Sequence, residues 1–458
     1  MNHLPSAKCG FILTVILLLL PSFRGQAAEL TGRAILAADT FAPGSTTAQF
    51  KKTKRTTPFS NAQPVQGFSS VIAGTKPGTF LVISDNGFGS KANSLDYGLR
   101  IYAVEPDFVG GKVFPVNFQT GERLFSFNRQ SFVELSDKRS LMPKAYRNSL
   151  VNFSAIAEQT NYPGSNIPVS PLIKANRLLT GGDFDIESFR RSPDGSFWMG
   201  DEFGPFLLHF GAKGELLEAP FPVPNLLRIG KSDFVQSPDN PEFDPDFTKL
   251  TDSVARNAAA NLGGSKGFEG MALNPRGTML YAMLEGVIKD DVQKKRLLIY
   301  EFDLTSKKYT GQVFAYQLEN PNHAIGDLTA VNNEEFLVIE RDNNQGDSRN
   351  SAFKNPAKFK RIYKINLQKV NQAGFVEKEL LVDLLNISDP NGIGGNGTKD
   401  GIFVFPFVTI ESVLPLDEKT LLVINDNNYA DSIGRIPEQI DNTEFIRISL
   451  NKPLNLSR

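Results

Sequence analysis

The feature that most constrains this chain is a hairpin pattern that recurs along its length. In the clearest copy, GDFDIESFRRSPDGSFWMGDEFGP at 182–205, apolar runs flank a Ser-Pro-Asp-Gly turn and carboxylates stand near both ends. Two apolar runs joined by such a turn are typical of a β-hairpin. Related copies begin near residues 69, 269, 327 and 411. Five copies indicate a repeat architecture rather than chance similarity.

A further strand-like segment follows each hairpin, at 99–108, 206–216, 296–306, 361–367 and 445–453. Each unit therefore supplies at least three antiparallel strands, which cannot bury both faces alone and must stack on neighbouring units. Four-stranded sheets arranged radially solve this problem, so the sequence predicts an all-β fold of the β-propeller type with loop insertions. The segment 29–41 is a candidate strand that could close the ring by joining the last blade.

The number of blades depends on the long gaps between hairpins. The first and second hairpins start 118 residues apart, which leaves room for a whole blade within about 110–180. We therefore expect six blades, with five or seven left open. In the second gap, a Pro-rich loop at 218–245 precedes a predicted helix at 252–262, which ends at a Gly-Gly pair.

The N-terminus has the features of a secretory signal peptide. Residues 1–27 combine Lys8, a short apolar run at 11–20 and small residues before Ala28, and the run is too short for a membrane span of about 30 Å. We expect a secreted or periplasmic protein that is not membrane-embedded after cleavage, with one domain at 28–458. Cys9, the only cysteine, is lost with the signal, which excludes disulfides and a thiol nucleophile from the mature chain.

The charge balance of the mature chain argues against nucleic acid as a partner. Removal of Lys8 and Arg24 leaves 47 of the 49 basic residues against 50 acidic ones, and no long basic run remains. We expect a monomer that acts on a small molecule. His209 and His323 lie far apart, without a zinc spacing or a Gly-x-Ser-x-Gly signal.

The repeated carboxylates are the strongest chemical signal. If the hairpins are equivalent, Glu187, Glu269, Asp327 and Glu411 converge at one end of the channel. Carboxylates held close together either raise their pKa values or bind a cation, and a set of oxygen ligands suits Ca²⁺. Acids at the end of the second strand or after it extend the set, namely Asp201, Glu202, Glu285, Glu340, Asp342 and Asp426. Ser69 replaces the acid in the first hairpin, so a metal contribution from that hairpin is in doubt.

Three basic residues stand beside these acids. Arg341 follows Glu340, Lys91 follows an Asp-Asn-Gly turn, and Lys266 precedes the Gly-Phe-Glu of the third hairpin. Guanidinium and ammonium groups at such positions could hold phosphate oxygens, although most basic residues next to acids form surface ion pairs.

A family resemblance accompanies these patterns. The stretches DIESFRRSPDGSFWMGDEFGPFLLHFGAKGEL, KGFEGMALNPRGTMLYAMLEG, FLVIERDNN and SDNGFGSKANSLDYGLRIYAVEPDF resemble those of the phytase-like family, described as having the esterase-like activity of phytase. The resemblance covers most of the mature chain, from about residue 31 to 450. It implies a secreted β-propeller and suggests phosphoester hydrolysis with Ca²⁺ assistance.

The first functional hypothesis is therefore a phosphoric-ester hydrolase that uses Ca²⁺ to activate water. Catalysis is assigned to Glu187, Glu269, Asp201 and Glu202; metal binding to Glu187, Glu269, Glu285, Asp327 and Glu411; and substrate binding to Arg341, Lys91 and Lys266. Two alternatives stay open. One is a Ca²⁺-dependent carboxylesterase or lactonase, and the other is a non-enzymatic propeller that binds a ligand.

Overall fold

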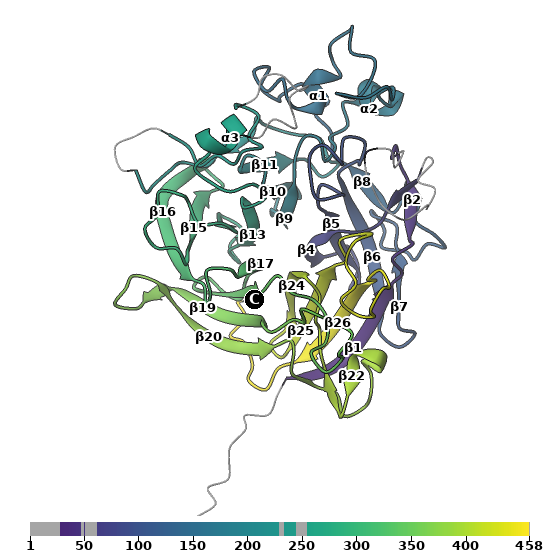
Figure 1. The fold of residues 1–458 in the computed structure, drawn as a ribbon, viewed down its shortest axis with the longest axis vertical. Helices are drawn as coiled ribbons and strands as arrows, with labels where there is room; N and C mark the ends of the chain where they lie inside the picture. The colour runs from purple at the N-terminus through teal and green to yellow at the C-terminus, as the bar shows by residue number, and fades with distance from the viewer. Residues whose placement is uncertain (1–27, 47–49, 51–61, 229–232, 244–253, 458) are drawn as a thin grey trace, which may run out of the picture.

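The computed structural model describes residues 28–46, 50, 62–228, 233–243 and 254–457, so the predicted signal peptide lies outside the described residues. The described chain is all-β. Three four-stranded sheets and a twelve-stranded sheet, whose two parts are joined where Ile35 pairs with Lys112, form five blade-like units around a centre (Figure 1). The innermost strands of the five units contact one another in a ring. They are β4 (Phe68–Ala73), β9 (Ile186–Arg191), β13 (Phe268–Leu273), β17 (Ala324–Ala330) and β24 (Thr409–Asp417).

Each inner strand begins an antiparallel meander that runs outward through its blade. Blade 1 continues through β5 (Phe80–Ser84), β6 (Arg100–Asp107) and β7 (Lys112–Pro115), and blade 2 through β10 (Phe197–Asp201), β11 (Phe206–Phe210) and β12 (Phe221–Pro222). Blade 3 continues through β14 (Met279–Leu284), β15 (Arg296–Asp303) and β16 (Lys308–Gln317), and blade 4 through β18 (Glu335–Arg341), β19 (Lys360–Val370) and β20 (Val376–Asp383). The repeated hairpins of the sequence are thus the two inner strands of each blade.

The fifth blade joins the two ends of the described chain. It contains β24, β25 (Thr420–Asp426), β26 (Thr443–Ser449) and, as its outer strand, β1 (Glu29–Leu36). The β1–β26 register runs antiparallel from Glu29 opposite Ser449 to Leu36 opposite Thr443. This pairing confirms the expectation that the N-terminal strand closes the ring.

The expected sixth blade is not among the described residues. Within 110–180 the structure contains β7, β8 (Phe132–Glu134), α1 (Leu150–Phe153) and α2 (Pro171–Asn176), and both strands pair with β6 of blade 1. The strand-like patterns there extend an existing sheet and do not form a separate blade within the described residues. The helix predicted at 252–262 is present as α3 (Val254–Ala259) within the described residues.

Shorter elements decorate the blades: β2 (Phe41–Pro43), β3 (Ala62–Pro64), β21 (Ile387–Ser388), the 3₁₀ helix η2 (Gly395–Gly397), β22 (Thr398–Lys399) and β23 (Ile402–Phe403). The apolar core lies between adjacent blades and not at the centre. Phe189 and Met199 of blade 2, for example, pack with Ile83 and Ile101 of blade 1. In the part of the chain that the structure describes, no helix combines the length and the hydrophobicity that a membrane crossing requires.

A buried charge cluster holds the ring closure together. Glu444 of β26 is 1% exposed and binds Arg33 of β1 at 2.5 Å and Arg435 at 2.9 Å. Both guanidinium groups donate two hydrogen bonds to this one carboxylate. Removing one partner of a buried ion pair leaves the other charges without compensation.

We therefore expect Glu444→Gln to lower the free energy of unfolding by about 3–5 kcal/mol, because two buried arginines lose their counter-charge. Denaturant-induced unfolding measures the effect. The control is Glu122→Gln, whose ion pair with Lys76 is largely exposed, and here we expect a change of at most about 1 kcal/mol. Equal effects of the two substitutions would show that Glu444 does not stabilise the closure.

A candidate active site in two rings of acidic side chains

An irregularity in each inner strand positions the first set of site residues. The register between the first and second strands of every blade skips one residue of the inner strand. A residue bulged out of a ladder is unpaired and its side chain is re-aimed. The five skipped residues, here called the inner ring, are Ser69, Glu187, Glu269, Gly326 and Glu411.

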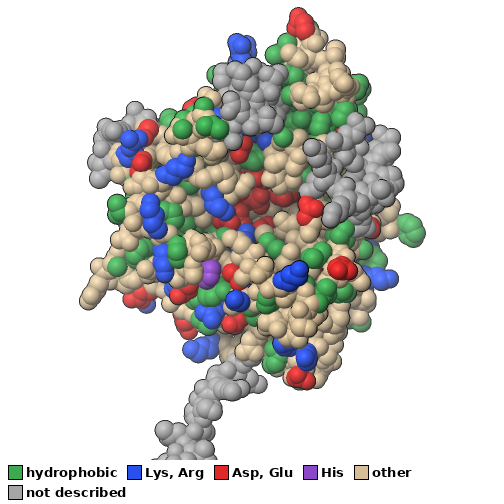
Figure 2. Space-filling view, viewed as in Figure 1, with side chains coloured by type: hydrophobic (Ala, Val, Ile, Leu, Met, Phe, Trp, Pro, Cys, Tyr) green, Lys and Arg blue, Asp and Glu red, His purple; other side chains and the backbone are tan. Residues whose placement is uncertain are grey.

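A second set follows from the same register. On the second strand of each blade, one residue pairs with the inner-strand residue directly before the bulge. This partner is the last residue of the second strand or the one before it. The residue after that partner occupies an equivalent place in all five blades. These five residues, here called the outer ring, are Asp85, Glu202, Glu285, Arg341 and Asp426. Figure 2 shows acidic side chains gathered at the bottom of a hollow at the centre of this face.

The acids of the rings form two overlapping groups that could hold a cation. One group is Glu187, Glu269 and Glu411, and the other is Asp185, Glu187 and Glu202. In each group one carboxylate oxygen per residue lies within 4.8 Å of the others, and all members are buried. Glu187 belongs to both groups and therefore links the inner ring to Glu202.

Two basic residues offset part of this charge. Arg341 lies 3.2 Å from Glu285 and 3.5 Å from Glu411, and Lys266 forms an ion pair with the other oxygen of Glu285. Against these two cations stand eight carboxylates that interact with one another: Asp85, Asp185, Glu187, Glu202, Glu269, Glu285, Glu411 and Asp426. The site thus has a large excess of acidic groups.

The excess of acidic groups affects their pKa values. Burial, followed by repulsion from neighbouring carboxylates, raises the pKa of Glu187, Glu202 and Glu269 well above the ordinary value. The same causes raise the pKa of Glu411, and burial raises that of Asp426 to about 6. A cation would relieve this repulsion, and acids with raised pKa values are also suited to proton transfer near neutral pH.

Asp327 was expected to join the other repeated acids, but the structure places it elsewhere. The bulged residue of blade 4 is Gly326, where a Cβ atom would lie 1.9 Å from the carbonyl oxygen of Ile410. Asp327 comes one residue later. Its carboxylate accepts hydrogen bonds from Arg190 at 3.2 Å and from the Val413 amide at 2.9 Å. Its oxygens therefore accept hydrogen bonds from two other blades, and it belongs to neither acidic group.

Asp201 and Lys91 also have other partners. The Asp201 carboxylate accepts hydrogen bonds from the backbone amides of Asp185 and Gly204, so it holds the loop that carries Glu202. Lys91 donates to the carbonyl of Asp239 at 3.2 Å and lies over the ring of Phe203. Neither residue occupies a ring position. The structure brings seven of the candidate residues together: Glu187, Glu202, Glu269, Glu285, Glu411, Arg341 and Lys266.

Two acids of the site were not assigned from the sequence. Asp85 is in the first of the repeated hairpins, and equivalence with Glu202, Glu285 and Asp426 could have identified it. Asp185 lies two residues before the bulged residue of blade 2. The equivalent positions in the other blades hold Gly67, Gly267, Ala324 and Thr409. No repeat could indicate it, because only one blade carries an acid at that position.

His209 has partners that resemble a hydrolytic triad. Its Nε2 lies 2.9 Å from Ser196 Oγ and its Nδ1 lies 3.2 Å from Glu218 Oε1. However, Ser196 Oγ also lies 2.6 Å from Asp194, and the imidazole stacks on Trp198 with ring centroids 4.2 Å apart. Ser196 and His209 are each 6% exposed. The contacts are those of a packed turn.

Comparison with known proteins identifies the family. Residues 63–429 match the model of the phytase-like family, which is described as esterase-like activity of phytase. The match spans most of the chain, and the chain therefore belongs to this family. An uncharacterized secreted protein from Arthroderma benhamiae is 28% identical over 222 residues, or 43% of this chain and 42% of that protein. The chain thus matches less than half of this relative's length.

Similar solved structures are remote. A luciferin-regenerating enzyme has a TM-score of 0.38 and 12% identity, over 94% of this chain and 98% of that one. The calcium-binding protein regucalcin from Agrobacterium tumefaciens has a TM-score of 0.34 and 10% identity, over 94% of this chain and 97% of that one. At these scores neither structure supports an argument about this chain.

The raised pKa values predict how stability depends on pH. Burial raises the pKa of Asp183, Asp201 and Asp327 to about 6, 7 and 6. Between pH 4 and 7 the unfolded chain loses protons that the folded chain retains, so the folded state is favoured at the lower end. In a chelating buffer, we expect the free energy of unfolding to fall as pH rises through this window. Denaturant titrations at pH 5 and 7.5 measure it, and a rise would contradict the prediction.

The repulsion can be tested by neutralising one acid. In a chelating buffer at pH 8, Glu269→Gln should raise the free energy of unfolding by on the order of 1 kcal/mol, because one pKa unit corresponds to about 1.4 kcal/mol. Glu122→Gln, at an exposed position, should change it little. Destabilisation by Glu269→Gln would show that this carboxylate is satisfied in the folded protein.

Proposed function

We propose that this chain is an exported phosphoric-ester hydrolase whose active site is the two rings of acidic side chains. The observation that carries the proposal is the composition of the rings. They combine an excess of buried carboxylates with a single arginine, Arg341, and with Lys266 at their edge. Family membership supports ester hydrolysis. Export is supported by the predicted signal sequence and by the relative described as secreted.

The acids suit a hard divalent cation such as Ca²⁺, and we assign its binding to Glu187, Glu269 and Glu411. All donors are oxygens, as Ca²⁺ prefers. Oε1 of Glu269 and Oε1 of Glu202 are buried and have no hydrogen-bond partner among the described residues. Unpaired buried acceptors are costly, and a cation would satisfy them. When bound, Ca²⁺ would supply charge neutralisation for the phosphate and would lower the pKa of a water molecule.

The remaining roles belong to side chains of this chain. Arg341 and Lys266 hold the anionic oxygens of the phosphoryl group, whose charge they stabilise as the reaction proceeds. A carboxylate with a raised pKa, Glu202 or Glu269, accepts the proton of the attacking water. The water oxygen forms a bond to phosphorus while the ester P–O bond breaks. The leaving alcohol takes up a proton, so the step is balanced without a covalent enzyme intermediate.

The test uses protein from Ala28 onward with aryl phosphate, phytate and aryl acetate, in Ca²⁺ and then in a chelator. We expect phosphate release that disappears in the chelator. It should fall at least about 100-fold in kcat/KM in Glu187→Gln and Glu269→Gln, as expected for lost acid–base chemistry. Glu122→Gln, which is exposed, is the matched control and should retain activity.

Other outcomes favour the alternatives. Cleavage of the acetate alone, with little loss in Arg341→Met, would indicate a Ca²⁺-dependent carboxylesterase or lactonase. Acetate cleavage lost in Ser196→Ala but not in the chelator would indicate a serine esterase at His209. If no ester is cleaved while the chelator lowers the melting temperature, the protein is a Ca²⁺-stabilised binding propeller. Each of these results would overturn the phosphoesterase.

A further inference from the structure

A cavity at the other end of the β9–β10 hairpin from the acidic rings is lined in part by the insertion that was expected to form a blade. Its volume is about 740 Å³, within the usual range for small-molecule sites. It lies between blades 1 and 2, with β8 and α2 of the insertion as two of its walls. Arg191, Gly195 and Phe197 reach it from the turn of the β9–β10 hairpin, whereas Glu187 and Glu202 lie at the other end of that hairpin.

Apolar side chains form part of the walls of this cavity. Leu81 and Phe197 are buried beneath it, and Phe118, Val133 and Leu178 are half-buried. Leu172 of α2 is 51% exposed at its edge. Apolar side chains in a concave surface favour a ligand with an apolar body, because binding removes their surface from water.

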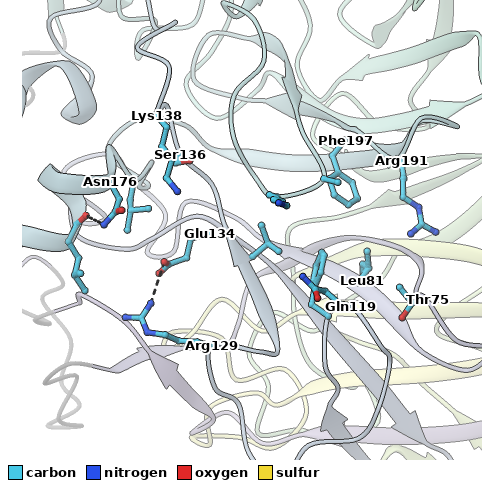
Figure 3. Close-up of a pocket in the computed structure, with 17 residues that line it drawn as sticks. Thr75, Leu81, Gln119, Arg129, Glu134, Ser136, Lys138, Asn176, Arg191 and Phe197 are labelled. Atoms are coloured by element: carbon cyan, nitrogen blue, oxygen red, sulfur yellow. Dashed lines mark hydrogen bonds and ion pairs between the residues drawn. The ribbon is translucent and has the colours of Figure 1, made fainter.

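The charged groups of the cavity are mostly basic. Arg129, Lys138, Arg191 and Lys213 line it, against one acid, Glu134. Glu134 is already compensated, since it lies 2.9 Å from Arg100 and 3.6 Å from Arg129. Figure 3 shows Glu134 directed toward Arg129, with Lys138 and Arg191 on opposite sides of the cavity. Lys138, Arg191 and Lys213 form no ion pair within the described residues, so their charge is available to an anion.

From this combination we propose that the cavity binds an amphipathic organic anion, with an apolar body and one anionic headgroup. The apolar walls take the body, and Lys138, Lys213 and Arg191 attract the headgroup. Carboxylate and phosphate headgroups share the required chemistry. The inference does not rest on the proposed hydrolase activity, because the cavity shares no residue with the acidic rings.

Binding can be measured with protein from Ala28 onward and 8-anilinonaphthalene-1-sulfonate, an apolar aromatic sulfonate whose fluorescence rises on burial. The competitors are decanoate, decyl phosphate, decyltrimethylammonium and inorganic phosphate. We expect saturable binding at one site, displaced by decanoate or decyl phosphate. The cationic amphiphile and inorganic phosphate should not displace the probe, since one has the wrong charge and the other has no apolar body. The tighter of the two decyl anions identifies the preferred headgroup.

Matched variants separate the cavity from general surface charge. Lys138→Glu with Lys213→Glu should weaken binding at least tenfold. Lys308→Glu with Lys354→Glu, which makes the same change in net charge at exposed positions on other blades, should change it less than twofold. Leu172→Asp, at an exposed position that should not disturb folding, should also weaken binding tenfold, and Glu269→Gln should leave it unchanged.

Three results would overturn the proposal. They are the absence of saturable binding of both the probe and the decyl anions, equal displacement by decyltrimethylammonium, and equal losses in the two double-lysine variants. Loss of ester hydrolysis in the Glu269→Gln variant would not affect the result. The two proposals can therefore fail independently.

Discussion

Repulsion among buried carboxylates is the constraint on which the centre of this molecule depends. Glu187, Glu269 and Glu411 come from three different blades, and their oxygens approach within 4.8 Å. Placing such groups together away from water destabilises the folded state, so other parts of the structure must hold them in position. The apolar layers between the blades and the continuous strand pairing provide this rigidity. A preorganised site of this kind is typical of functional centres, where local stability is given up for chemistry.

Arg190 and Asp327 join the inner strands on which the acids stand. Arg190, on β9, donates hydrogen bonds to Ser70 of β4 and to Asp327 and the Leu328 carbonyl of β17. Asp327 in turn accepts the Val413 amide of β24. One ion pair thus connects four of the five inner strands. Because both groups are buried and hydrogen-bonded, the pair fixes the geometry of the centre, whatever its net contribution to stability.

The blade pattern could be predicted from the sequence, because alternating apolar runs and turn residues act locally. The carboxylates of blades 2, 3 and 5 followed from the repeat, since equivalent positions in stacked blades share a place. The position of the bulge did not follow. In blade 4 the skipped residue is Gly326, and the next residue, Asp327, faces Arg190. A one-residue difference in register changes which side chain is re-aimed, and hydrophobic periodicity does not indicate it.

The strand pairing of the insertion at 110–180 could not be predicted from local sequence patterns either. Its strand-like runs have the right composition for a new blade, but β7 and β8 both pair with β6 of blade 1. Whether a strand extends an old sheet or starts a new one depends on which edges are free in three dimensions. The pairing of β8 with blade 1 also forms the cavity between blades 1 and 2, because β8 and α2 lie beside the turn of the β9–β10 hairpin.

The five blades are not equivalent, so the charges at the centre are distributed unevenly. Blade 4 contributes Gly326 to the inner ring and Arg341 to the outer ring, where other blades contribute acids or Ser69. The close approach of Gly326 to the Ile410 carbonyl leaves no space for a side chain there. Positive charge is consequently concentrated on the side of blades 3 and 4, where Arg341 and Lys266 both contact Glu285. Under the proposed function, an anionic group in the hollow would be drawn to that side, next to Glu269 and Glu411, and a substrate with one anionic end would bind in one orientation.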